Sequence, residues 1–82
     1  MVGRKVGIVG AGFVGATTAY SLTVHGTCHE VILYDIATDI ALGKAIDIGQ
    51  STSYSLQGTI VTPAKDASDL KDCDIVVITA GV

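Results

Sequence analysis

The stretch GIVGAGFVG, residues 7–15, decides how this chain folds. It overlaps an apolar run that starts at Arg4 or Lys5 and ends at Val9, and it leads into a segment in which apolar residues recur up to Val24. A short apolar run, a glycine-rich turn and a longer apolar segment predict a strand, a tight turn and a helix in that order.

The same region contains no charged side chain from Val6 to Val24, so it also has the length and hydropathy of a membrane segment or a secretion signal. Four glycines occupy its first half and five hydroxyl side chains its second half. Glycine disrupts an apolar helix, and so many hydroxyls are unusual in one that spans a bilayer. We therefore expect no membrane association.

The rest of the chain alternates between strand and helix patterns. Gly26 is placed to end the first helix in a left-handed conformation, and residues 31–34 form an apolar run without alternation, typical of a strand buried on both faces. A second helix is expected from Thr38, as its N-cap, with an apolar face at Leu42, Ala45, Ile46 and Gly49.

Two further strands are expected, at residues 58–62, stopped by Pro63, and at residues 74–79. Between them, residues 66–72 are long enough for only a turn or two of helix. With right-handed crossovers, these elements predict an α/β fold whose parallel strands lie in the order 3-2-1-4.

This order leaves both long helices on one face of the sheet, and only residues 63–73 to cover the other face. It also leaves the apolar fourth strand at an edge, which natural proteins normally avoid. We therefore interpret residues 1–82 as the first half of a doubly wound Rossmann domain, with the rest of that domain and any catalytic domain absent from the sequence.

Gly10, Gly12 and Gly15 form a G-x-G-x-x-G motif between the first strand and the first helix. In such a motif the first glycine permits the tight turn, the second lets a pyrophosphate approach the backbone, and the third allows close packing of the helix. The backbone amides near Phe13 and Val14, at the positive end of the helix, are the expected phosphate donors. Turn formation and close packing without any ligand are the alternative explanation.

Asp35 ends the second strand, 20 residues after Gly15. A carboxylate at this position can accept hydrogen bonds from the ribose hydroxyls of adenosine, and it would repel a 2′-phosphate. The sequence therefore predicts NAD rather than NADP as cofactor, with Asp35 and the following Ile36 among the contacting residues. A helix-capping or solvated carboxylate is the alternative role for Asp35.

Composition and residue spacing bear on which partners, metal sites and catalytic residues to expect. A net charge of −3 gives no reason to expect a nucleic-acid partner, and Cys28 and Cys73 lack the spacing of a zinc site or a disulfide framework. They are expected to be reduced thiols in a cytoplasmic protein. His25 and His29 flank the end of the first helix, where a structural role is more natural than catalysis. We assign no catalytic and no metal-binding residue.

Taken together, GAGFVGATTAY, LYDI, GKAIDI at residues 43–48 and DIVVITAG at residues 74–81 resemble the N-terminal quarter of the L-lactate/malate dehydrogenase family. The resemblance implies that Gly10, Gly12, Gly15 and Asp35 hold the adenosine diphosphate part of NAD. It also implies that Thr79, Ala80 and Gly81 line the cofactor cleft, and that residues 43–48 lie near the subunit interface of a homo-oligomer, a dimer or a tetramer.

The family transfers a hydride between NAD and a small 2-hydroxy acid, using a histidine, an aspartate and arginines that have no counterpart in these 82 residues. Lys44 in GKAIDI favours malate as the substrate, with lactate as the alternative. Two other possibilities stay open. One is a regulatory nucleotide-binding module without catalysis, and the other is that the 82-residue chain is itself inactive.

Overall fold

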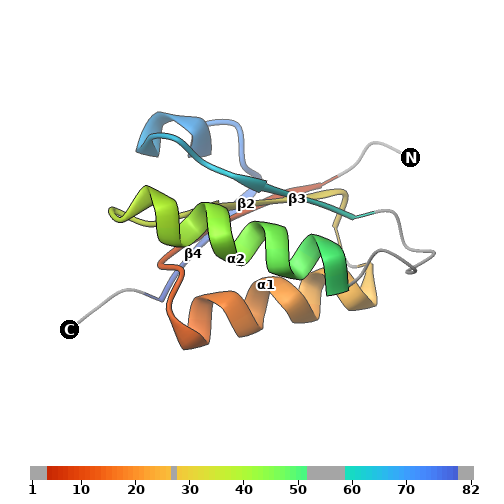
Figure 1. Ribbon diagram of the computed structural model, residues 1–82. Coiled ribbons are helices and arrows are strands. Elements are labelled where there is room, and N and C mark those ends of the chain that lie inside the picture. The colour runs from red at the N-terminus through yellow and green to blue at the C-terminus, as the bar shows by residue number, and fades with distance from the viewer. Residues whose placement is uncertain (1–3, 27, 52–58, 80–82) are drawn as a thin grey trace.

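The computed structural model describes residues 4–26, 28–51 and 59–79. They form a parallel sheet of four strands, β1 (Lys5–Val9), β2 (Glu30–Tyr34), β3 (Ile60–Pro63) and β4 (Ile75–Ile78), in the order β3-β2-β1-β4. Helices α1 (Phe13–His25) and α2 (Thr38–Ser51) pack together on one face, and the short 3-10 helix η1 (Ala67–Leu70) crosses the other (Figure 1). The predicted Rossmann arrangement and its strand order are confirmed.

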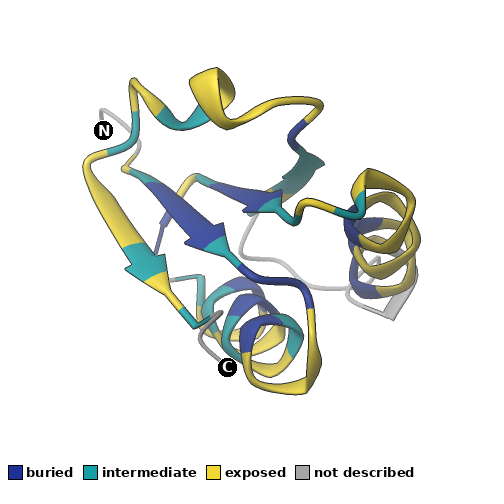
Figure 2. Cartoon of the chain, turned by 90° about the vertical axis from the view of Figure 1, so that its left-hand side faces the viewer, coloured by how far each residue is buried: buried dark blue, intermediate teal, exposed yellow. Residues whose placement is uncertain are grey.

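The core lies between the sheet and the two long helices. Ile8, Val31 and Leu33 are fully buried there, and Val6 pairs with Val31 as Ile8 pairs with Leu33, which places all four side chains on the same face. Three buried helix residues complete this layer: the small Ala19 and Ala41, and the larger Ile48. Figure 2 shows the buried residues concentrated in the central strands and on the inner sides of α1 and α2.

The opposite face is covered by η1 alone among the described elements. Gly7 pairs with Ile32, so the Ile32 side chain is on this side of the sheet. A β-carbon added at Gly7 would lie 2.7 Å from Leu70 Cδ2 and 3.0 Å from Cys73 Sγ. Asp66 caps η1 by accepting a hydrogen bond from Ser68 N, while Asp69 accepts reciprocally from Asp66 N. The thin cover predicted for this face is thus observed.

α1 ends as predicted, because Gly26 adopts a left-handed conformation with φ 62° and its N–H reaches the carbonyl oxygens of the last turn. Within the described residues, the structure contains no helix with the length and hydropathy needed to span a membrane. Cys28 is buried, Cys73 is partly buried, and both are free thiols.

Three local predictions were wrong. Thr38 is the first residue of α2 rather than its N-cap, because Ala37 O accepts the first helical bonds, from Ile40 N and Ala41 N. Pro63 does not stop β3 but is its last residue, opposite Leu33 on an edge strand, where a missing N–H is tolerated.

The third error concerns the buried face of α2. Ala41, Ala45 and Ile48 are buried, whereas Leu42 and Ile46 are each 49% exposed and Gly49 is also exposed. The small side chains of Ala41 and Ala45 let the helix backbone approach its neighbours closely, which leaves the larger Leu42 and Ile46 at the margin. The predicted face was therefore turned by about one residue, with only Ala45 correctly placed.

Candidate cofactor-binding site

The predicted site residues meet at the carboxyl ends of three neighbouring strands. Gly10 follows β1, Asp35 follows β2 and Thr79 follows β4. Gly10 N donates to Tyr34 O, at the end of β2, at 2.7 Å. Thr79 N, just after β4, donates to Val9 O at 2.9 Å. The ends of β2 and β4 are therefore both hydrogen-bonded to the end of β1. In open α/β sheets this is where ligands bind, at the point where the strand order reverses direction.

Gly10 and Gly15 are required by the fold itself. Gly10 has φ 109°, a conformation that residues with a side chain rarely adopt. A β-carbon at Gly15 would collide with the carbonyl oxygen of Gly10 and lie 2.9 Å from Thr79 Oγ1. The predicted turn and the predicted close packing of α1 are therefore both present.

Gly12 differs from these two glycines. Its φ of −73° suits any residue, and a β-carbon added there would meet no atom within 4 Å. Neither backbone strain nor packing within the described chain therefore explains a glycine at this position. The open space above Gly12 is what a ligand lying against the backbone needs.

The first turn of α1 opens towards the same space. Ala16 N donates to Gly12 O at 2.9 Å, and no side chain caps this end of the helix. Across residues 4–26, 28–51 and 59–79, the backbone N–H groups of Phe13 and Val14 have no acceptor. Unpaired N–H groups at the positive end of a helix are suited to bind an anion such as a pyrophosphate.

Asp35 binds the backbone on both of its sides. Its Oδ2 accepts from Ala11 N at 2.8 Å and its Oδ1 from Ala37 N at 3.0 Å. These two bonds, that from Ala11 first, lower the pKa of the Asp35 carboxyl below its usual value, against a smaller opposing effect of burial. Asp35 is thus ionised at neutral pH, and each of its oxygens retains a further acceptor position.

A pocket of about 230 Å³ lies beside these groups and is lined by Val9, Gly10, Tyr34, Asp35 and Ile36. Ile36 is 89% exposed and Phe13 is 85% exposed, so both offer apolar surface at this end of the sheet. Two further predicted residues, Ala80 and Gly81, lie outside the described residues.

Two residues of this site, Ala11 and Tyr34, were not predicted from the sequence. Ala11 N donates to Asp35 and so holds the glycine loop, residues 10–12 between β1 and α1, against the end of β2. Tyr34 lines the pocket and accepts the hydrogen bond of Gly10 N. Each is adjacent in sequence to a residue that was predicted, which is the only signal that pointed to them. His25 lies at the far end of α1, where its Nδ1 is 2.8 Å from Ser21 O.

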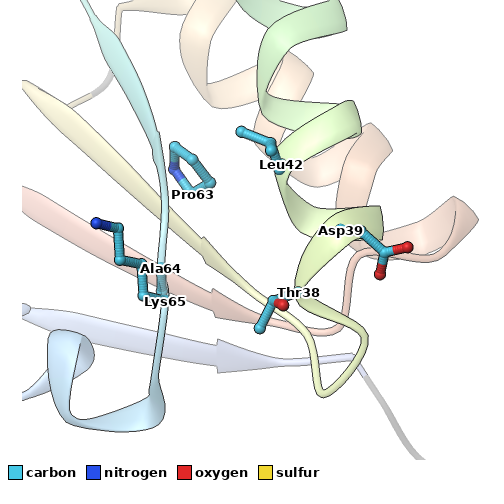
Figure 3. Close-up of a pocket in the computed structure, with 6 residues that line it drawn as sticks. All are labelled: Thr38, Asp39, Leu42, Pro63, Ala64 and Lys65. Atoms are coloured by element: carbon cyan, nitrogen blue, oxygen red, sulfur yellow. The ribbon is translucent and has the colours of Figure 1, made fainter.

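A larger pocket, of about 300 Å³, lies between α2 and the end of β3 (Figure 3). None of its six lining residues belongs to the predicted site: Thr38, Asp39, Leu42, Pro63, Ala64 and Lys65. The Asp39 carboxylate points away from the gap between Leu42 and Pro63. Without converging polar groups, this pocket is a weaker candidate than the smaller one beside the glycine loop.

The chain is similar in sequence to known malate and lactate dehydrogenases. The chain is 53% identical over 79 residues to a malate dehydrogenase of Sulfurimonas denitrificans, a match that covers 96% of this chain and 25% of that protein. It is 44% identical over 79 residues to L-lactate dehydrogenase 2 of Lactococcus lactis, covering 96% of this chain and 25% of that protein. The chain thus spans about a quarter of the length of these curated relatives.

Solved structures agree. A lactate dehydrogenase from a Medee basin deep-sea metagenome library superposes with a TM-score of 0.89 at 40% identity, covering all of this chain and 26% of that one. A malate dehydrogenase from Salinibacter ruber superposes with a TM-score of 0.88 at 37% identity, covering 96% and 26%. Residues 4–82 match the family described as the lactate/malate dehydrogenase NAD binding domain, and the chain belongs to that family.

Proposed function

We propose that the chain is the N-terminal part of the NAD-binding domain of a longer dehydrogenase, which transfers a hydride between NAD and a small 2-hydroxy acid. The observation that carries this proposal is the ionised Asp35 beside an unobstructed glycine loop, in a chain of this family. The family match also favours an enzyme over a regulatory nucleotide-binding module.

In this proposal the pyrophosphate of NAD lies over Gly12 and accepts hydrogen bonds from the N–H groups of Phe13 and Val14. Asp35 accepts bonds from the adenosine ribose, and the apolar surface of Ile36 lies against the adenosine. Gly10 and Gly15 shape the loop, while Ala80 and Gly81 are further predicted contacts. The catalytic residues lie outside this chain, so the 82 residues alone are expected to be inactive.

We favour malate as the substrate and keep lactate as the alternative. Lys44 in GKAIDI supports malate, and relatives of both names have similar sequences. The test is to measure the intact mass of the natural protein and then its NAD-dependent turnover of malate and of lactate. A mass of roughly 30–35 kDa, typical of two domains, with faster turnover of malate is expected. Faster turnover of lactate would reverse the substrate assignment.

The cofactor assignment has its own test in the full-length enzyme. Asp35→Ser combined with Ile36→Arg removes the charge that would repel a 2′-phosphate and adds a partner for it, so kcat/KM should shift from NAD towards NADP by about tenfold or more. An unchanged kcat/KM for NAD in the Asp35→Ser single variant would contradict the ribose contact.

We further propose that the full-length protein is a cytoplasmic homo-oligomer, a dimer or a tetramer, with α2 near a subunit interface. The half-exposed Leu42 and Ile46 on α2 support the interface. Light scattering of the full-length protein tests it, and a Leu42→Glu, Ile46→Glu double variant should dissociate.

A further inference from the structure

Thr79 makes a set of contacts that concern the glycine loop rather than the pocket. Its backbone N–H and its hydroxyl both donate to Val9 O, at 2.9 Å and 3.1 Å, and the hydroxyl is also 3.4 Å from Gly10 O. The single hydroxyl proton is therefore already shared between the last carbonyl of β1 and the first carbonyl of the loop. The hydroxyl is thus directed at the loop, and Thr79 is not among the residues that line the pocket.

The same hydroxyl lies where three segments meet. A β-carbon at Gly15 would lie 2.9 Å from Thr79 Oγ1 and would collide with Gly10 O. The end of β4, the start of the loop and the first turn of α1 thus pack on one another at this point without room for an added methyl group. A change in the direction of the Gly10 carbonyl would move the first turn of α1.

Asp35 holds the loop from the other side, through Ala11 N. The loop is consequently held at two successive residues. Gly10 donates its N–H to Tyr34 O at 2.7 Å and lies with its carbonyl oxygen 3.4 Å from the Thr79 hydroxyl, and Ala11 donates to Asp35. The space beside Gly12 stays open. A loop held in this way before the ligand arrives loses less conformational entropy on binding.

We propose that Thr79 is a positioning residue for pyrophosphate binding, whose hydroxyl fixes the carbonyl groups of Val9 and Gly10 and so the direction of the first N–H groups of α1. This inference rests on the proposed function. It differs from a cleft-lining role, because Thr79 acts through the loop and makes no contact with the cofactor.

The experiment compares Thr79→Val and Thr79→Ser in the full-length dehydrogenase. Thr79→Val removes the hydroxyl and should raise the Kd for NADH and for ADP-ribose about five- to tenfold, the effect of one lost hydrogen bond. The Kd for adenosine, which has no pyrophosphate, should stay within about twofold. The KM for NAD should rise with kcat unchanged, and Thr79→Ser should restore wild-type values.

A second measurement separates positioning from direct contact. In the protein without cofactor, hydrogen–deuterium exchange of the peptide containing residues 9–15 should be faster in Thr79→Val than in the wild type and in Thr79→Ser. Thr62→Val is the matched control, because it removes a threonine hydroxyl that donates to Glu30 Oε2 at 2.6 Å, away from the loop. It should alter neither the exchange of this peptide nor the Kd for ADP-ribose.

Two results would overturn the inference: wild-type affinity of Thr79→Val for ADP-ribose, or an equal loss of affinity for adenosine and ADP-ribose. If Thr79→Val does not fold, Thr79→Ala and Thr79→Ser are compared, and equal loss in both variants overturns it as well. A wild-type enzyme that binds neither NADH nor ADP-ribose would instead overturn the proposed function, and the inference with it.

Discussion

Gly12 and Gly15 are three residues apart in one motif, yet they lack a side chain for different reasons. At Gly15 the neighbouring backbone occupies the space that a β-carbon would need, whereas at Gly12 that space is empty. The motif thus combines one glycine whose β-carbon the fold has no room for with one, at the N-cap of α1, beside which the space stays open.

Alanine at each position should separate these two roles. Gly15→Ala forces α1 away from Gly10, so we expect a loss of about 1–3 kcal/mol in the free energy of unfolding, as for other overpacked sites. Gly12→Ala should leave the free energy of unfolding within about 0.5 kcal/mol of the wild type but raise the KM for NAD, and Gly12→Val should raise it further. Urea unfolding and steady-state kinetics of the full-length enzyme provide both quantities. Normal cofactor affinity in Gly12→Val would contradict the close approach of the pyrophosphate.

Asp35 should make stability depend on pH. The bonds from Ala11 N and Ala37 N keep its folded-state pKa below the unfolded value of about 3.9. Its contribution is therefore complete above the unfolded pKa and is lost as the pH falls through the folded-state pKa. We expect the difference in unfolding free energy between the wild type and Asp35→Asn to be largest at neutral pH and to shrink below about pH 4.

Denaturant unfolding at a series of pH values measures this difference. Asp72→Asn, at an exposed position in the turn before β4, controls for the loss of one negative charge. A difference that stays constant down to about pH 2 would show that the two bonds do not depend on the charge of Asp35.

At the scale of elements, the strands and helices followed from the sequence because each has a clear local signal. Unbroken apolar runs indicated the buried strands, and Gly26 marked the end of α1. The errors at Thr38 and on the face of α2 arose at the start of that helix and in the choice of its buried side. The first helical bonds go to Ala37 O rather than to Thr38 O, and the packing of the small alanines sets which face of α2 is buried. The second of these depends on the neighbouring elements and not on local sequence alone.

The positions of the site residues were predictable from the sequence, but the contacts between them were not. The glycine spacing and the position of Asp35 placed these residues at the carboxyl ends of the strands, as observed. The bond from Ala11 N to Asp35 was not predictable, because it depends on the path of the loop between two strands that are distant in sequence. The contact of Thr79 with Gly10 was missed for the same reason.

The fit of η1 against the sheet can be tested at Gly7. Gly7→Ala would press on Leu70 and Cys73, whose side-chain ends can shift, so we expect a loss of only about 1 kcal/mol in unfolding free energy. Burial raises the pKa of the Cys73 thiol, with a smaller lowering effect of Lys5, and displacement of η1 should reduce that burial. Cys73 should therefore react faster with iodoacetamide.

Gly43→Ala is the matched control for Gly7→Ala. Gly43 lies in α2, and a β-carbon there would meet no atom within 4 Å. Because alanine is a better helix former than glycine, this variant should be as stable as the wild type or more stable, with unchanged labelling of Cys73. Equal labelling rates in Gly7→Ala and Gly43→Ala would contradict the proposed contact between η1 and the sheet.

At the scale of the whole molecule, β4 is an edge strand with exposed apolar side chains. Ile75 is 56% exposed and Ile78 is 71% exposed, and β4 pairs only with β1 among the described strands. An apolar edge strand with unpaired backbone groups promotes pairing with other chains. This agrees with the proposal that further strands adjoin β4 in a longer protein.

The 82-residue chain expressed alone should therefore associate, and light scattering at increasing concentration should give a rising average mass. Ile78→Lys places a charge on this edge and should reduce the association. Ile60→Lys is the control, because Ile60 is 54% exposed on the other edge strand, where Pro63 already limits pairing. A chain that stays monomeric without the Ile78→Lys change would contradict the importance of this edge.

The bond between Asp35 and Ala11 also bears on the engineering of cofactor preference. Replacing Asp35 to accept a phosphorylated ribose also removes an acceptor that holds the glycine loop. Libraries that vary position 35 alone would mix gains in recognition with losses in loop order, and useful variants would be discarded as inactive. Screens should instead start from a stabilised background, or restrict position 35 to side chains that can still accept a hydrogen bond from Ala11.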